Sequence, residues 1–180
     1  MIHGSGGAVL FDLDGTLINN VPYNGDVDKV KFVWHARESI AMLRRRGIKT
    51  VCVTNQSGIN RGFITHSQVR AINEKVKDHL LLDWIGYCQH KPDEKCDCRK
   101  PGTGLVEQAR HELNYSFTLA VVGDSECDEL LARKIGVPFY DVRVMTLRTA
   151  IRLICHKYCP LTPYSKKGQI LYAQNKRWKK

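Results

Sequence analysis

The segment FDLDGT (residues 11–16) places two carboxylates two positions apart, directly after an apolar run that begins at Ala8. Residues i and i+2 of a strand point the same way, so we expect Asp12 and Asp14 to share a face, with Gly15 turning the chain behind them. One carboxylate can attack phosphorus while the other moves the leaving group's proton. Like charges this close need a cation, and oxygen ligands beside a phosphate ester indicate Mg²⁺. The alternative is an ordinary Asp-Gly turn at a strand end.

A second cluster brings three cysteines and a histidine within eleven residues: Cys88, His90, Cys96 and Cys98. Three thiolates and one imidazole suit a closed tetrahedral Zn²⁺ site of the structural kind. Zinc would order the polar loop 88–98 and thereby fix Arg99 and Lys100, which follow the last ligand directly. The cluster is therefore expected to position the chemistry and not to perform it. The alternative is reduced thiols beside an unrelated histidine.

Alternating apolar and amphipathic segments predict the elements that position these residues. Strands are expected at 8–14, 48–54, 84–88, 118–124 and 137–142, and helices at 36–46, 66–81, after Pro101 and at 126–136. This order predicts an α/β fold with a Rossmann-like, doubly wound, mainly parallel sheet and helices on both faces. Ligands gather beyond the carboxyl ends of such strands, so Asp12, Asp14, Thr54 and Asp124 are expected to converge.

The net charge of +10 lies in the C-terminal part of the chain. Residues 142–180 hold ten of the 28 Lys and Arg and no Asp or Glu, so residues 1–141 hold 18 of each sign. We expect one domain at 1–157, including the zinc-binding loop 88–98, and a basic tail at 158–180. The tail is either a nucleic-acid contact or a solvated segment that aids solubility. Cys155, His156 and Cys159 are expected to lie on a helix without forming a second metal site.

No apolar run approaches the roughly 18 residues that span a bilayer, so we expect no membrane partner. The first residues lack the features of a secretory signal. These observations predict a cytoplasmic protein with reduced thiols, and we expect a monomer.

Four motifs together resemble the haloacid dehalogenase superfamily of aspartate-nucleophile phosphatases: FDLDGT, VTNQSGINRG, CRKP and GDSECD. The resemblance covers roughly residues 8–142. The segment TNQSGINRGFIT and the Cys-x-His…Cys-x-Cys loop are similar to the branch that contains heptose-bisphosphate phosphatases and histidinol-phosphate phosphatases. No room is left for a separate cap domain, so the resemblance implies a capless member with an open site.

The resemblance implies catalytic roles for the carboxylates. Asp12 would be the nucleophile that forms an aspartyl-phosphate, and Asp14 would protonate the leaving oxygen and then activate water. Mg²⁺ would be held by the Asp12 carboxylate, the Asp14 carbonyl and Asp124. Asp128 would either orient water ligands of the metal or act as a first-turn acid favoured by the helix dipole.

The resemblance also assigns groups that hold the substrate. Thr54 would bind the transferring phosphoryl group, and Lys100 would neutralise charge that develops on it. The remaining expected substrate-binding residues are Asn55, Gln56, Ser57, Arg99, Asn20 and Tyr23, the last two within a segment similar to one in the heptose enzymes.

The first functional hypothesis is a phosphatase that removes the 7-phosphate from D-glycero-D-manno-heptose 1,7-bisphosphate, a small-molecule phosphate ester. The alternatives are a polynucleotide 3′-phosphatase, a histidinol-phosphate phosphatase and a non-catalytic, zinc-stabilised binding module. Leu13 and Ser125 stand where heptose-branch members usually carry Arg and often Lys, and these departures leave the substrate preference open.

Overall fold

The computed structural model describes residues 6–158, in which five parallel strands form one sheet in the order β3-β2-β1-β4-β5. The strands are β1 (Ala8–Phe11), β2 (Lys49–Asn55), β3 (Trp84–Cys88), β4 (Thr118–Gly123) and β5 (Phe139–Asp141). The helices are η1 (Val27–Lys29), α1 (Ala36–Arg44), α2 (His66–Leu80), α3 (Gly104–Leu113), α4 (Glu126–Ile135) and α5 (Leu147–Tyr158). The predicted α/β class with a parallel sheet is confirmed.

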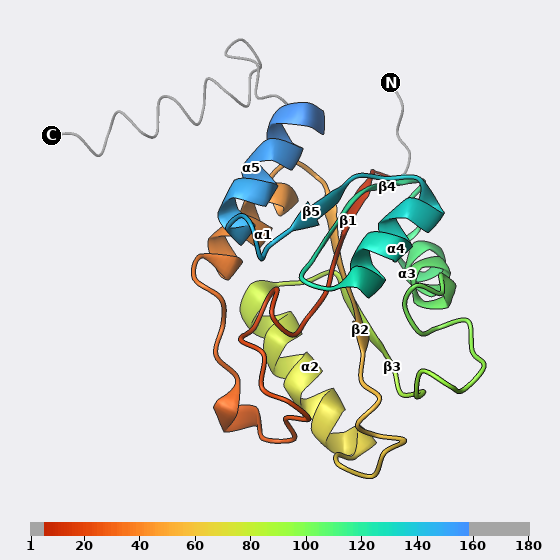
Figure 1. The fold of residues 1–180 in the computed structure, drawn as a ribbon. Helices are drawn as coiled ribbons and strands as arrows, with labels where there is room; N and C mark the ends of the chain where they lie inside the picture. The colour runs from red at the N-terminus through yellow and green to blue at the C-terminus, as the bar shows by residue number, and fades with distance from the viewer. Residues whose placement is uncertain (1–5, 159–180) are drawn as a thin grey trace, which may run out of the picture.

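Alternate residues of the central strand β1 pack into two separate cores. In β1, Val9 and Phe11 pack into the core that contains buried side chains of α1, α2 and α5. Ala8 and Leu10 point the other way, into the core formed with α3 and α4. Figure 1 shows these two helical layers on either side of the sheet. The central strand is therefore apolar throughout and buried on both faces, as expected for a parallel sheet.

Helix boundaries follow local capping chemistry. Thr65 accepts a hydrogen bond from Gln68 N and completes a capping box, so α2 begins where the sequence predicts. Gly136 ends α4 in the left-handed region at φ 73°, also as predicted. Helix α1 ends at Arg44, two residues earlier than expected, and Arg46 and Gly47 continue as hydrogen-bonded turns.

Residues 12–35 form a long connection between β1 and α1, pinned by an antiparallel bridge between Ile18 and Phe32. Within residues 6–158, no helix is long and apolar enough to cross a membrane. The predicted basic tail lies outside the described residues except for Tyr158, and so does Cys159. Cys155 and His156 both belong to α5.

Candidate active site

Three carboxylates meet at the carboxyl edge of the sheet. Asp12 follows β1 and Asp124 follows β4, while Asp128 lies in the first turn of α4. One oxygen from each falls within 4.8 Å of the others. Gly15, at φ 82°, permits this approach, because a Cβ there would overlap the Asp124 carboxylate. The predicted convergence of distant chain segments at this edge is confirmed for Asp12 and Asp124.

Lys100 is the cation of this cluster. Its side chain is 3% exposed, and its Nζ donates to Asp12 Oδ1 and, at 2.7 Å, to Asp128 Oδ1. Asn55 fixes the lysine main chain from both sides: Oδ1 accepts from Lys100 N at 3.0 Å, and Nδ2 donates to Lys100 O at 3.3 Å. In this structure Asn55 therefore positions Lys100.

The electrostatics of the cluster favour an added cation. Burial raises the pKa of Asp12 to about 7, although the Lys100 ammonium opposes the shift. Burial, together with the nearby Asp128 carboxylate, also raises the pKa of Asp124. For Lys100, burial alone would lower the pKa, but the two carboxylates outweigh it and raise the value. Three carboxylates thus share one ammonium, and the oxygen donor set fits Mg²⁺.

Asp128 acts as a first-turn acid of α4, one of the two roles that the sequence analysis considered, and it also pairs with Lys100, which the sequence analysis did not predict. It is fully buried and accepts hydrogen bonds from the Ser125 hydroxyl and from Ser125 N, which completes a capping box at the start of α4. The same carboxylate pairs with Lys100. The Asp128 side chain therefore binds both the N-terminus of α4 and the buried Lys100.

Asp14 lies in a different environment from Asp12. Strand β1 ends at Phe11, so strand alternation does not place the two carboxylates. Asp14 Oδ2 accepts a hydrogen bond from Gln56 Nε2 at 2.7 Å, and the same nitrogen donates to Thr54 Oγ1 at 3.2 Å. Burial raises the pKa of Asp14, and the bond from Gln56 opposes that shift.

A cavity of about 330 Å³ opens beside Asp14. It is lined by five of the six residues expected to bind the substrate: Asn20, Tyr23, Asn55, Gln56 and Ser57. Tyr23 stands at its outer side, 49% exposed, with its ring centroid 4.6 Å from that of Phe63. The wall also includes Asn73 of α2, which the sequence analysis did not select.

Arg99, the sixth expected substrate residue, does not line this cavity. Its Nη1 donates to His90 O at 3.0 Å, so the guanidinium is held against the cysteine-rich loop. Lys100 and Arg99 are adjacent in sequence, yet Lys100 contacts the carboxylate cluster and Arg99 contacts the cysteine-rich loop.

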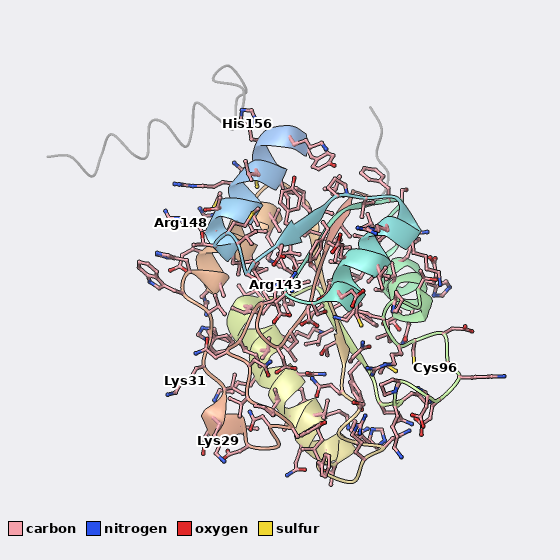
Figure 2. The ribbon with its side chains drawn as sticks, in the orientation of Figure 1. Lys29, Lys31, Cys96, Arg143, Arg148 and His156 are labelled. Carbon is pink, nitrogen blue, oxygen red and sulfur yellow. The ribbon has the colours of Figure 1, made fainter. Side chains whose placement is uncertain are left out.

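The cysteine-rich loop brings its four candidate ligands together. The donor atoms of Cys88, His90, Cys96 and Cys98 lie within 4.8 Å of one another. His90 Nδ1 is 3.2 Å from Cys98 Sγ and 3.4 Å from Cys88 Sγ. Such a set suits tetrahedral Zn²⁺. Figure 2 shows Cys96 on this outlying loop, on the opposite side of the molecule from Arg148.

Comparison with known proteins fits this geometry. The family model of polynucleotide kinase 3 phosphatase matches residues 8–126, from the start of β1 to the start of α4. The chain belongs to this family. It is therefore a phosphatase, and its fold is that of the haloacid dehalogenase superfamily.

Named relatives extend over most of the described residues. The Haemophilus ducreyi D-glycero-beta-D-manno-heptose-1,7-bisphosphate 7-phosphatase is 36% identical in an alignment of 143 residues that covers 72% of this chain and 79% of the relative. A Thermoplasma acidophilum protein, named "Probable D-glycero-D-manno-heptose-1,7-bisphosphate 7-phosphatase", is 34% identical in an alignment of 138 residues that covers 73% of this chain and 86% of the relative.

Solved structures show the same fold at lower identity. D,D-heptose 1,7-bisphosphate phosphatase from B. bronchiseptica, crystallised with magnesium and phosphate, superposes with a TM-score of 0.69 at 22% identity, covering 84% of this chain and 99% of the other. The Pnkp1/Rnl/Hen1 complex gives a TM-score of 0.54 at 18% identity, covering 77% of this chain and 45% of the other.

Proposed function

We propose that this phosphatase removes the 7-phosphate from D-glycero-D-manno-heptose 1,7-bisphosphate through an aspartyl-phosphate on Asp12. The observation that carries the proposal is the buried cluster of Asp12, Lys100 and Asp128 beside Asp124, with Asp14 next to it at the wall of a cavity. The two relatives described above are named for this activity. Each alignment covers more than two thirds of both chains.

The two carboxylates divide the reaction between them. The Asp12 carboxylate attacks phosphorus, the bond from phosphorus to the ester oxygen breaks, and Asp14 gives its proton to the departing oxygen. In the second step Asp14 takes a proton from a water molecule, which attacks phosphorus and releases Asp12 and inorganic phosphate. The raised pKa of Asp14 suits a group that must alternate between acid and base.

Mg²⁺ would be held by the carboxylates of Asp12 and Asp124 and by the Asp14 carbonyl. When bound, it neutralises charge on the phosphoryl oxygens and on the attacking carboxylate, which otherwise repel each other. Asp128 is occupied by Lys100 and Ser125, so we assign it the role of holding the lysine.

Lys100 would neutralise negative charge on the transferring phosphoryl group. Its ammonium is already held by Asp128, and its main chain by two hydrogen bonds with Asn55, so no side-chain ordering is needed during the reaction. Thr54, 2% exposed at the end of β2, would present its hydroxyl to the same group.

The departing sugar would occupy the cavity beside Asp14, in contact with Asn20, Tyr23, Gln56 and Ser57. Arg99 would bind the substrate only after leaving its present bond to the His90 carbonyl.

Structural Zn²⁺ would be held by Cys88, His90, Cys96 and Cys98. The close approach of their donor atoms supports this assignment. A bound zinc would fix the loop from which Arg99 and Lys100 emerge, so it would act on catalysis through position alone.

A second candidate function is polynucleotide 3′-phosphatase, and a groove on the other side of the catalytic edge favours it. This groove, about 570 Å³ in volume, runs from Gly15 and Thr16 to the segment Val142–Arg148. Trp34 on its rim is 84% exposed and stacks on His35 at a centroid distance of 4.3 Å. An exposed indole of this kind can stack on a nucleobase.

Basic side chains continue from that groove along α5. Arg148, Arg152 and His156 are exposed at four-residue intervals on this helix, and Figure 2 shows Arg148 and His156 along one side of it. Residues 142–158 contain no acidic residue. The Arg143 charge is, however, neutralised by Asp141, whose Oδ2 accepts from Arg143 Nη2 at 2.6 Å.

Turnover of three esters in the presence of Mg²⁺ separates these functions: heptose 1,7-bisphosphate, histidinol phosphate and a 3′-phosphorylated oligonucleotide. We expect the highest kcat/KM for the heptose ester. Preferential hydrolysis of the oligonucleotide, falling steeply with added salt, would establish the second candidate. No turnover of any ester, with Asp12→Asn leaving ligand binding unchanged, would contradict both.

A further inference from the structure

Asn73 is a polar residue on the buried face of α2, where the helical spacing of the sequence predicts an apolar residue. The buried side chains of this helix are Val69, Ile72, Asn73, Val76 and Leu80, which is the spacing of one helical stripe. The Asn73 residue is only 5% exposed, and its Oδ1 is buried without a hydrogen-bond partner. Buried polar atoms are nearly always satisfied, so an unpartnered acceptor calls for a donor from outside the chain.

The surroundings of Asn73 show where that donor would come from. Asn73 lines the cavity that contains Asp14, together with its neighbours Val69 and Ile72. Other parts of the wall carry amide and hydroxyl groups, from Asn20, Asn24, Gln56 and Ser57. A cavity lined by apolar side chains and by several neutral hydrogen-bonding groups fits a polyhydroxylated chain.

Asp14 sets the direction of the substrate in this cavity. The group that protonates the ester oxygen must contact the departing side of the substrate, and Asp14 lies on the cavity wall. The leaving alcohol therefore extends toward α2. This step rests on the proposed function, because it takes Asp14 as the general acid.

We propose that Asn73 is a specificity-determining residue whose side-chain amide forms a hydrogen bond with a hydroxyl of the leaving alcohol. The class of substrate so selected is a phosphate ester of a polyol or sugar. An ester without hydroxyls would leave the amide without this hydrogen bond.

Two variants and one matched control test the proposal. Asn73→Leu removes the acceptor at similar size, and Asn73→Ala does so with a smaller side chain should the first variant not fold. Ser39→Ala is the control, because Ser39 Oγ of α1 is also buried and unpartnered but does not line the cavity. Each protein is assayed with heptose 1,7-bisphosphate, glycerol phosphate, a hexose phosphate and p-nitrophenyl phosphate.

We expect Asn73→Leu to lower kcat/KM for the hydroxyl-bearing esters by about tenfold relative to p-nitrophenyl phosphate, mainly through KM. Ser39→Ala should keep the wild-type ratio. Equal losses on all four esters would overturn the proposal, because they would mean that Asn73 supports only the shape of the site.

The two possible failures are distinguishable. Should the wild type hydrolyse another polyol phosphate and not the heptose ester, with a KM that depends on Asn73, the proposed substrate would fail while this inference stood. Should the wild type hydrolyse p-nitrophenyl phosphate as efficiently as every hydroxyl-bearing ester, the inference would fail whichever ester is the natural substrate.

Discussion

Lys100 Nζ lies 2.7 Å from Asp128 Oδ1, and the two side chains are 3% and 1% exposed. They come from the segment after the cysteine-rich loop and from α4, so one ion pair joins two sections of the carboxyl edge. A buried charge that loses its partner is strongly destabilising, so this pair stabilises the carboxyl edge of the sheet.

Replacing Asp128 by Ala should therefore lower the free energy of unfolding by about 3–5 kcal/mol, because it leaves the Lys100 ammonium with one carboxylate fewer. It also removes the capping box of α4. Urea denaturation measures the change. Glu129→Ala is the control, since its exposed pair with Arg133 contributes only about 0.5 kcal/mol. Equal effects of the two substitutions would contradict the assigned role of Asp128.

Asp12→Asn should reduce kcat by about 10⁴-fold or more, since an amide oxygen cannot form the covalent intermediate. The exposed Asp78 of α2 provides a control, and Asp78→Asn should retain normal rates. Acid quenching of the wild type during turnover, followed by peptide mass spectrometry, should locate a phosphoryl group on Asp12. A phosphorylated residue elsewhere would refute the nucleophile assignment.

A comparison of Gly15→Ala with Gly47→Ala distinguishes the effect of backbone strain from the effect of a steric clash in the active site. Both glycines have positive φ, 82° and 73°, so either alanine should cost about 1–2 kcal/mol of stability. Only the Cβ at position 15 meets another group, the Asp124 carboxylate, whereas nothing lies within 4 Å of the one at position 47.

We expect Gly15→Ala to lose about 10²-fold in kcat because Asp124 is displaced, while Gly47→Ala keeps its activity. Thermal denaturation and initial rates on the same samples check both quantities. A Gly15→Ala enzyme of normal activity would show that Asp124 has no role in the reaction.

Metal analysis should find about one zinc per chain, and a strong chelator should lower both Tm and activity in a way that added Mg²⁺ does not reverse. Cys96→Ser should remove the zinc. Cys127→Ser is the matched control, because that cysteine is also partly exposed but lies in α4. A folded, active wild type without zinc would rule out the structural metal.

The fold could be predicted because local signals agreed with it. Apolar runs of strand length, the Thr65 cap and Gly136 each depend on nearby residues. The structure places the cap and Gly136 as expected, whereas β1 ends at Phe11, before the predicted end of that strand. The position of Asp12 and Asp124 followed from topology alone, since parallel strands place their carboxyl ends on one edge.

The directions of side chains depend on tertiary contacts, so they were harder to predict from the sequence. Nothing in the sequence indicates that Arg99 turns to a carbonyl in the cysteine-rich loop, or that Gln56 bridges Asp14 and Thr54. Asn73 did leave a signal, because it interrupts the apolar stripe formed by Ile72 and Val76. A polar residue at such a position is a reason to look for a cavity.

Asp12, the proposed nucleophile, follows β1, which lies in the middle of the sheet and is hydrogen-bonded to β2 on one side and to β4 on the other. Edge strands β3 and β5 can open locally without disturbing that ladder. The amides of Val9 to Phe11 should accordingly be among the slowest to exchange with deuterium. Local opening of the edge strands on heating would leave β1, and with it Asp12, in place until the whole domain unfolds.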